Sequence, residues 1–222
     1  MFVAAASSGP SYGGQATERA RKLTAMSSPR DTVQYRMMKR SQTDQVQQND
    51  PNMKHIVWDF AYGHGLSTSG VRDDELVRLA DAMAQNTCLQ DISIKGNKLA
   101  NSSISKLSKA LKKCGVVNVH ATDTNLSPKD LGKIKQQCVL NAMARVQADD
   151  MSLAAIDWRN SRITDEDVIK LTKVLRGNTH LTHLNLSGNR ASSAFRYGVT
   201  DQAGKALEVV MPHCGLLDLD LR

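Results

Sequence analysis

The residues of this sequence whose types could perform chemistry are its six histidines and four cysteines. His180 and His183 lie three residues apart, and His120 could face the same surface. A zinc ion needs several side chains that converge at tetrahedral distances, which a pair of imidazoles does not supply. The cysteines show no CxxC pair and no metal-ligand spacing; they are Cys88, Cys114, Cys138 and Cys214. We therefore expect plain polar histidines, small thiols of a reducing compartment and no metal site.

The motifs of the common enzyme classes do not occur in the sequence. We find no GxSxG elbow, P-loop, HExxH or kinase-type pattern. The segments "SGNRASS" and "YGHGLSTSG" contain Gly and Ser, but neither leads into the helix that a phosphate cradle requires. The sequence thus predicts a protein without catalytic residues or a cofactor.

A repeating pattern begins after position 51, and the strands and helices that it predicts must position the histidines and cysteines. Its clearest unit is "LTHLNLSGNRA", in which Leu181, Leu184 and Leu186 stand at offsets 1, 4 and 6. The other units begin at Met53, Leu89, Val116, Leu153 and Leu216. Offsets 4 and 6 alternate as in a strand, and helical spacing follows them, as in the stretch after Thr164, a candidate N-cap. One strand–helix unit cannot bury its own apolar face, so we expect the units to stack.

The pattern LxxLxLxxNxL at a step of 28 residues resembles the ribonuclease-inhibitor class of leucine-rich repeats. The phrases "LADAMAQNTCLQDISIKGNKL" and "LTKVLRGNTHLTHLNLSGN" carry the resemblance most clearly, and it covers residues 53–222. It implies an α/β leucine-rich-repeat solenoid of about five and a half repeats, with parallel strands on the concave face and helices on the convex face. It also implies that Asn97 and Asn189, at offset 9, bond turn backbone between neighbours, and that Thr124 and Ser161 replace this Asn elsewhere.

The final segment "LLDLDL" fits the start of a sixth repeat. Leu219 and Leu221 would then lie on a strand with an uncovered edge, which repeat proteins usually cap. We expect either the insertion around residues 195–197 or a partner subunit to cover this edge.

Residues 1–51 differ from the repeats and form a polar, basic N-terminal tail, which leaves 52–222 as the leucine-rich-repeat domain. The segment "KRSQTDQVQQNDPN" has no usable periodicity and too little apolar surface to offset its ordering entropy. We expect an extended tail, or one ordered on a partner; a flexible solubilising tail is the alternative. Its candidate partner-binding residues are Arg30, Tyr35, Arg36, Lys39 and Arg40.

Three steps between units exceed 28 residues. Two of the insertions carry aromatic, His and Arg side chains that are typical interface anchors; they are Tyr62, His64, Phe195, Arg196 and Tyr197. The alternative is that they cover the local core. The third surplus lengthens a helix over 127–150, whose apolar stripe would cover the solenoid or dock its second half on a partner.

The basic charge of the chain is concentrated in one region. The formal net charge is +7, and from Ile92 to Thr122 there are six lysines and no acid. Helical spacing places Lys106, Lys109 and Lys113 on a convex face opposite the inward Ile104, Leu107 and Leu111. The concave strand positions carry Asp91, Asp157, Asp218 and Asp220, which predicts a more acidic front.

The lysine-rich face indicates an acidic protein surface or nucleic-acid phosphates as partner, against the alternative of a solvated helix face. Nucleic acid is the weaker of the two partners, because the lysine stretch contains no aromatic residue on which a base could stack.

The sequence lacks a secretory signal and a stretch of about 20 apolar residues that could span a bilayer. We expect an intracellular, cytoplasmic chain with no membrane partner. Its expected role is a non-catalytic protein–protein interaction module, a scaffold or structural subunit of a large complex.

Repeats of this class occur in actin-filament end-cappers, Ran GTPase activators and axonemal subunits. The resemblance therefore favours a cytoskeletal or axonemal complex, including a cilium or flagellum. The alternative is a mitochondrial or ribonucleoprotein complex, since the Ala/Ser-rich start of the chain is compatible with a mitochondrial presequence. A third reading is a GTPase-regulator-like binding protein.

Overall fold

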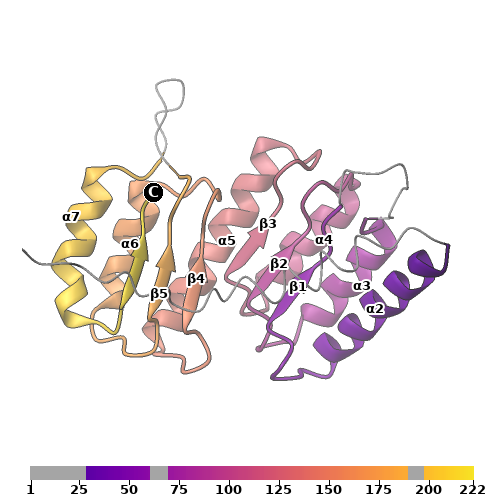
Figure 1. Ribbon diagram of the computed structural model, residues 1–222, viewed down its shortest axis with the longest axis horizontal. Helices are drawn as coiled ribbons and strands as arrows, with labels where there is room; N and C mark the ends of the chain where they lie inside the picture. The colour runs from indigo at the N-terminus through magenta and orange to yellow at the C-terminus, as the bar shows by residue number, and fades with distance from the viewer. Residues whose placement is uncertain (1–28, 61–69, 190–197) are drawn as a thin grey trace, which may run out of the picture.

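The computed structural model describes residues 29–60, 70–189 and 198–222. Helices and short strands alternate along these segments (Figure 1). The helices are α2 (Pro29–Gln47), α3 (Asp73–Met83), α4 (Asn101–Leu111), α5 (Pro128–Gln147), α6 (Asp165–Leu175) and α7 (Asp201–Val210). The strands are β1 (His55–Val57), β2 (Asp91–Ser93), β3 (Asn118–His120), β4 (Ala155–Asp157), β5 (His183–Asn185) and β6 (Asp218–Asp220). A 3₁₀ turn, Met211–His213, follows α7. Among these helices, none combines the length and the apolar character needed to cross a membrane.

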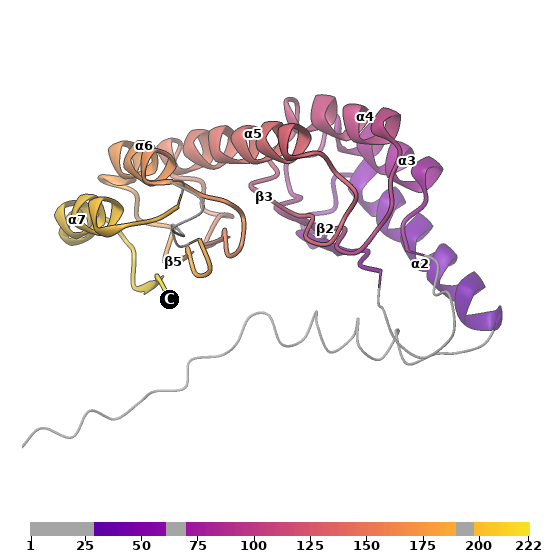
Figure 2. The same ribbon diagram turned by 90° about the horizontal axis from the view of Figure 1, so that it is seen from above.

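The strands form two parallel three-stranded sheets, β1-β2-β3 and β4-β5-β6. In the first sheet Ile92 pairs with Ile56 and with Val119; in the second, Leu184 pairs with Ile156 and with Leu219. This register is the one that the spacing of the apolar residues predicts, so the parallel α/β arrangement is confirmed. Figure 2 shows the helices along the outer side of an arc and the strands along its inner side.

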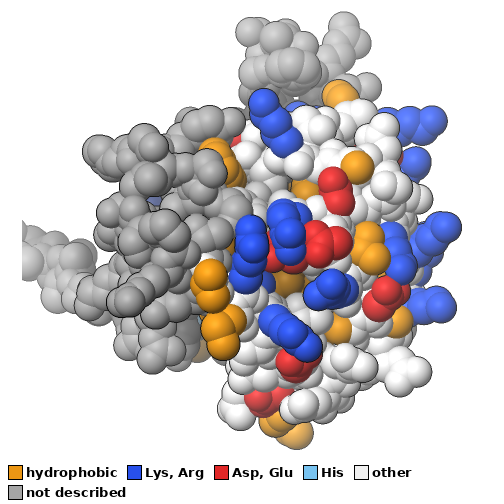
Figure 3. Space-filling view, turned by 90° about the vertical axis from the view of Figure 1, so that its right-hand side faces the viewer, with side chains coloured by type: hydrophobic (Ala, Val, Ile, Leu, Met, Phe, Trp, Pro, Cys, Tyr) orange, Lys and Arg blue, Asp and Glu red, His pale blue; other side chains and the backbone are white. Residues whose placement is uncertain are grey.

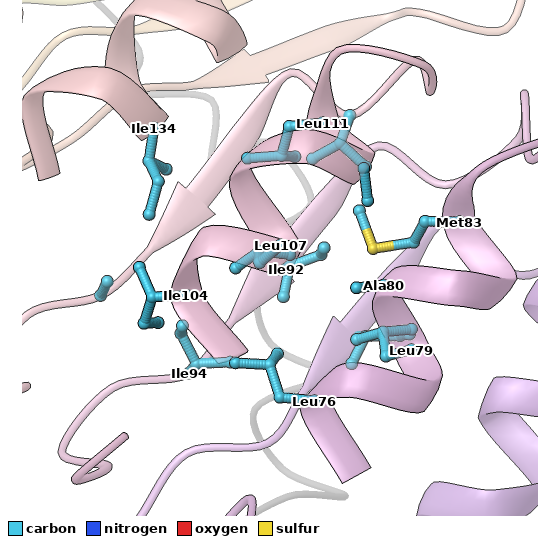
Figure 4. Close-up of a cluster of buried hydrophobic side chains, with 14 of the residues drawn as sticks. Leu76, Leu79, Ala80, Met83, Ile92, Ile94, Ile104, Leu107, Leu111 and Ile134 are labelled. Atoms are coloured by element: carbon cyan, nitrogen blue, oxygen red, sulfur yellow. The ribbon is translucent and has the colours of Figure 1, made fainter. Parts of the chain in front are cut away.

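The core lies between the strands and the helices. In Figure 4, side chains from α3, β2 and α4 point toward one another, and Ile134 joins them from α5. Ile104, Leu107 and Leu111 are buried on α4, as their spacing predicts. A second cluster around Trp158 lies under β4, β5 and β6. Full burial of each such side chain contributes about 1.5 to 3 kcal/mol, so the strands are held mainly by this packing.

The helix starts follow local capping rules. Thr164 begins α6 as predicted: its hydroxyl accepts a hydrogen bond from the Asp167 N–H, and the Asp167 carboxylate accepts one from the Thr164 N–H. Ser127 caps α5 in a similar way, with Pro128 at the first helical position. These caps satisfy backbone donors that the first turn of a helix leaves unpaired.

Buried asparagines connect the turns of neighbouring strand–helix units. The Asn189 Oδ1 accepts hydrogen bonds from the Ser161 and Ile163 N–H groups at 2.9 and 3.1 Å. Its Nδ2 donates to the Trp158 and Leu186 carbonyls. Asn97 makes the equivalent contacts to Val71, Trp58 and Ile94. The predicted bonding between neighbours therefore occurs at both positions.

The structure corrects the role expected of Thr124. Its hydroxyl donates only locally, to the Ala121 carbonyl, and it is the next residue, Asn125, that accepts from the Leu99 N–H of the neighbouring unit. The amide side chain that reaches the neighbour therefore stands one position later in this unit, at Asn125.

The N-terminal region also differs from the expectation. Residues 29–47 form a helix that packs on α3, not an extended tail. The inward positions of this helix include Tyr35, Lys39, Gln42 and the buried Val46, which follow helical spacing. Three of these four side chains are polar or amphipathic, so the apolar periodicity that marks the other helices is hidden. Residues 1–28 lie outside the described part of the chain.

Replacing Asn189 by Ala should lower the free energy of unfolding by about 2 to 4 kcal/mol, because the part-buried Ser161 N–H, the buried Ile163 N–H and two buried carbonyls lose their partner. Urea denaturation measures this loss. The matched control is Asn125→Ala, which removes a similar contact at an exposed position where water can replace the amide. Equal losses for the two variants would contradict the role given to burial.

Candidate functional site

The exposed face of α4 and of the turn that follows it carries an excess of positive charge. Lys109, Lys112 and Lys113 are exposed and make no ion pair within the described residues. Lys106, on the same helix, is paired with Asp81 of α3 at 2.8 Å. The predicted convex lysine face is therefore present, with Lys106 partly neutralised and Lys112 as a member that the sequence analysis did not select. We call Lys109, Lys112 and Lys113 the lysine face.

The outer side of α2 combines basic and apolar side chains. Arg36 and Arg40 are exposed, as are Met37 and Val33. Figure 3 views the end of the molecule that α2 forms and shows Lys and Arg side chains among acidic and hydrophobic ones. Two of the predicted tail residues, Arg36 and Arg40, are thus accessible to a partner, but from a helix. Arg30 lies in the first turn of the same helix.

Lys39 is a correction to the predicted contact residues, because its side chain is fully buried. Its Nζ lies 2.5 Å from the Glu75 Oε2 and donates to the Gly70 carbonyl at 3.1 Å. It also lies over the Tyr35 ring, 4.7 Å from the centroid. Burial lowers the pKa of Lys39, and burial with the nearby Asp59 and Glu75 raises the pKa of Tyr35. Lys39 therefore fastens α2 to α3 and is not available to a partner.

Five predicted contact residues cannot be placed. Tyr62, His64, Phe195, Arg196 and Tyr197 lie outside the described residues. Their proposed role as interface anchors stays a prediction.

The concave face is less acidic than the strand positions predict. Asp91 lies 2.6 Å from the His55 Nδ1 on the neighbouring strand. Asp157 is paired with Arg159, which lies two residues further along the chain, just beyond β4. Asp220 is paired with Arg222 in the same way, and hydrogen bonds from Arg222 hold the pKa of Asp220 below its usual range. Asp218, the fourth of these acids, is exposed and forms no ion pair within the described residues. The arginine partners of Asp157 and Asp220 follow two residues later in the sequence, whereas the pairing of Asp91 with His55 depends on the strand register.

A cavity of about 330 Å³ lies between β3 and β4, where the two sheets are separate. Its apolar walls include Ile134 and Cys138 of α5 and Trp158, and its polar rim includes His120 and Arg162. The Trp158 Nε1 donates to the Val117 carbonyl at 2.9 Å, so a side chain bridges the gap between the strands. The long step between Val116 and Leu153 is the only sequence signal of this break.

His120 lines this cavity together with the charged side chains of Asp123, Lys135 and Arg162. Its Nε2 lies 2.6 Å from the Asn118 Nδ2. Burial lowers the pKa of His120, with Lys95 and Arg159 adding to this and Asp157 and Asp91 opposing it. In the described segments, no three His, Cys, Asp or Glu side chains converge as metal ligands would. The imidazole can donate or accept a hydrogen bond to a bound group but has no partner set for metal or covalent chemistry here.

The thiols and the last strand complete the list of candidate residues. Cys114 and Cys138 are buried free thiols, whereas Cys88 and Cys214 are partly exposed.

Leu219 is half-buried against the second core cluster, and Leu221 is 40% exposed. The sequence analysis missed Leu217 and Val209, which are more exposed than either.

Comparison with known proteins assigns no family to this chain. No family model and no curated protein matches it. Among solved structures, the chain is similar to the tropomodulin C-terminal domain of Caenorhabditis elegans, with 13% identity and a TM-score of 0.45, over 78% of this chain and 93% of that one. It is also similar to the actin-binding site 2 of leiomodin-1, with 13% identity and a TM-score of 0.33, over 82% of this chain and 78% of that one. Likenesses of this size give the chain neither a family nor a partner.

The pKa of His120 leads to a prediction for stability. The unfolded chain binds a proton to this imidazole near pH 6.5, whereas the folded chain binds it only at lower pH. The unfolded state therefore holds more protons below pH 6.5, and stability should fall as the pH drops through that value. Each unit between the two pKa values changes the free energy of unfolding by about 1.4 kcal/mol.

Urea denaturation at pH 7.5 and pH 5.5 should show a smaller loss for His120→Gln than for the wild type. His213→Gln, at an exposed position, is the control and should keep the wild-type difference. The same loss in all three proteins would rule out His120 as the source of the pH dependence.

Proposed function

We propose that this chain is a non-catalytic protein–protein interaction module that acts as a structural or adaptor subunit of a large intracellular assembly. The observation that carries the proposal is the lysine face. Three exposed ammonium groups lie within five residues and have no acidic neighbour bonded to them in the described part of the chain. Such a concentration of one charge attracts a surface of opposite charge and speeds encounter with it.

The scaffold that we propose for this module is a leucine-rich-repeat solenoid of the ribonuclease-inhibitor-like class, with about five and a half repeats over residues 52–222. The parallel register of the strands and the asparagine contacts between neighbouring turns support it. A stack of this kind places the helices, and with them the lysine face, on the outside, where a flat or convex partner can reach.

An acidic protein surface is the proposed partner of the lysine face. The face contains no aromatic side chain on which a base could stack, which argues against recognition of single-stranded nucleic acid. Phosphates of a ribonucleoprotein or mitochondrial complex are the alternative, since ammonium groups bind them without stacking.

A cytoskeletal or axonemal complex is the setting that we favour, on the strength of the repeat-class resemblance. GTPase regulation is a third possibility, and no described residue favours it specifically.

Reversing the lysine face tests the proposal. In the source cells, a tagged full-length chain should sediment with a large complex, and the variant Lys109→Glu, Lys112→Glu, Lys113→Glu should sediment mostly as free protein. Exposed charge contacts contribute about 0.2 to 1 kcal/mol each, and reversal replaces each attraction by a repulsion of similar size, so the three together should lower the affinity by about tenfold or more. Nuclease treatment should leave the wild-type complex intact.

The control reverses three exposed cations elsewhere, in the variant Lys173→Glu, Arg176→Glu, Lys205→Glu on α6 and α7. It changes the net charge equally and should keep wild-type sedimentation. Full incorporation of the lysine-face variant would overturn the role of this face. Release of the wild-type chain by nuclease would contradict a protein partner and support the ribonucleoprotein alternative.

A further inference from the structure

The two halves of the chain repeat one another. β1 and β4 begin at residues 55 and 155, α4 and α7 at 101 and 201, and β3 and β6 at 118 and 218, a separation of 100 residues in each case. The segments "VQQNDPNMKHIVWDF" (46–60) and "VQADDMSLAAIDWRN" (146–160) show the same separation in sequence. Their buried members correspond, Ile56 to Ile156 and Trp58 to Trp158.

The hydrogen bonds of the two halves correspond as well. The Asn86 Nδ2 donates to the Val46 carbonyl at 2.8 Å, and the Asn178 Nδ2 donates to the Val146 carbonyl at 3.0 Å. The side chain of residue 49 accepts from the Thr87 N–H, as that of residue 149 does from the Thr179 N–H. We call the elements α2 to β3 the first half and α5 to β6 the second half; α2 is then the counterpart of α5, and β6 of β3.

Inside the chain, the second half covers the end of the first. The Asn141 Nδ2 of α5 donates to the Leu111 and Val116 carbonyls at 2.9 and 2.8 Å. The Trp158 Nε1 donates to the Val117 carbonyl. Val117 is consequently 0% exposed and belongs to the core cluster of the second half. This internal junction shows how the β3 end of one half is covered: the first helix and the first strand of the other half, α5 and β4, pack against it.

The corresponding surface at the end of the second half is apolar and open. Leu217, the counterpart of Val117, is 81% exposed. Leu221 is 40% exposed, whereas its counterpart Ala121 is 8% exposed. An apolar group at these positions is buried only when a further helix and strand pack against it, as α5 and β4 do on the first half.

We propose that the first half of a second copy of this chain covers this end, with its α2 and β1 in the places that α5 and β4 occupy at the internal junction. Met37 and Ser41 of α2, the counterparts of Gln137 and Asn141, are exposed and free to face a preceding end. Contact of one end with the opposite end is heterologous, so it leads to head-to-tail oligomers that can grow.

The charges of the two ends are complementary. The α2 end carries the exposed Arg36 and Arg40 at its margin, since the counterpart positions 136 and 140 stay exposed at the internal junction, and the β6 end carries the exposed Glu208 and Asp218. None of these four side chains forms an ion pair within the described residues. Pairing of two identical ends would bring like charges together, whereas head-to-tail contact brings opposite charges together.

Analytical ultracentrifugation of the purified full chain tests the inference. The average mass of the wild type should rise with concentration beyond that of a dimer. Leu217→Asp and Met37→Asp each block one end at an exposed position that can change without a folding cost, and each variant alone should stay monomeric. An equimolar mixture of the two should form a dimer, because the open α2 end of Leu217→Asp can bind the open β6 end of Met37→Asp. The dimer should grow no further, because both of its remaining ends are blocked.

Leu140→Asp is the control, since Leu140 lies on α5 and is 51% exposed away from both ends; it should assemble as the wild type does. A wild type that stays monomeric into the millimolar range would overturn the inference. So would a mixture of the two blocked variants that stays monomeric. The lysine face plays no part in this contact, so the result stands apart from that of the charge-reversal experiment.

Discussion

A strand of three residues followed by one helix can bury its apolar side chains only against another such unit. This constraint governs the whole chain, because each strand places its central residue, such as Ile92 or Leu184, in a row with its neighbours. The loops that make such stacking possible leave backbone groups without partners. The side chains of Asn97 and Asn189 satisfy those groups, and for that reason they are buried although they are polar.

The same constraint explains the junction between the two sheets. β3 and β4 are not paired in the described structure, and the indole of Trp158 bridges them through its hydrogen bond to the Val117 carbonyl. The space that remains between the two strands is the cavity lined by His120. The exposed Leu217 and Leu221 at the β6 end follow from the same rule, since no further unit of the described chain packs against them.

The sequence was sufficient to predict the parallel register, the N-cap at Thr164 and the inward stripe of α4, because each depends on local spacing alone. It did not reveal α2, whose inner side includes Lys39 and Gln42. Whether a lysine can be buried depends on a carboxylate such as Glu75, 36 residues away, which no local pattern shows. The pairing of Asp91 with His55 was missed for a similar reason, because it is set by the register of β1 and β2.

The candidate site was predictable to a similar extent. Helical spacing located the lysine face, but it could not show that Lys106 is paired with Asp81 while Lys112 is free of an acid among the described residues. The exposed Leu217 was not predicted either, since its counterpart Val117 has the same character and is buried. Only the position of a unit in the stack distinguishes the two.

Hydrogen exchange of the full chain over a range of protein concentrations tests most directly whether the β6 end of the second half is covered by a second copy of the chain. Residues 116–122 and 216–222 are counterparts, and Val117 and Ala121 of the first segment are buried within the chain whereas Leu217 and Leu221 of the second are exposed. The account predicts that amide protection of 216–222 rises with concentration, while protection of 116–122 is high throughout. Protection of 216–222 that is equally high at the lowest concentration, or that never changes, would contradict it.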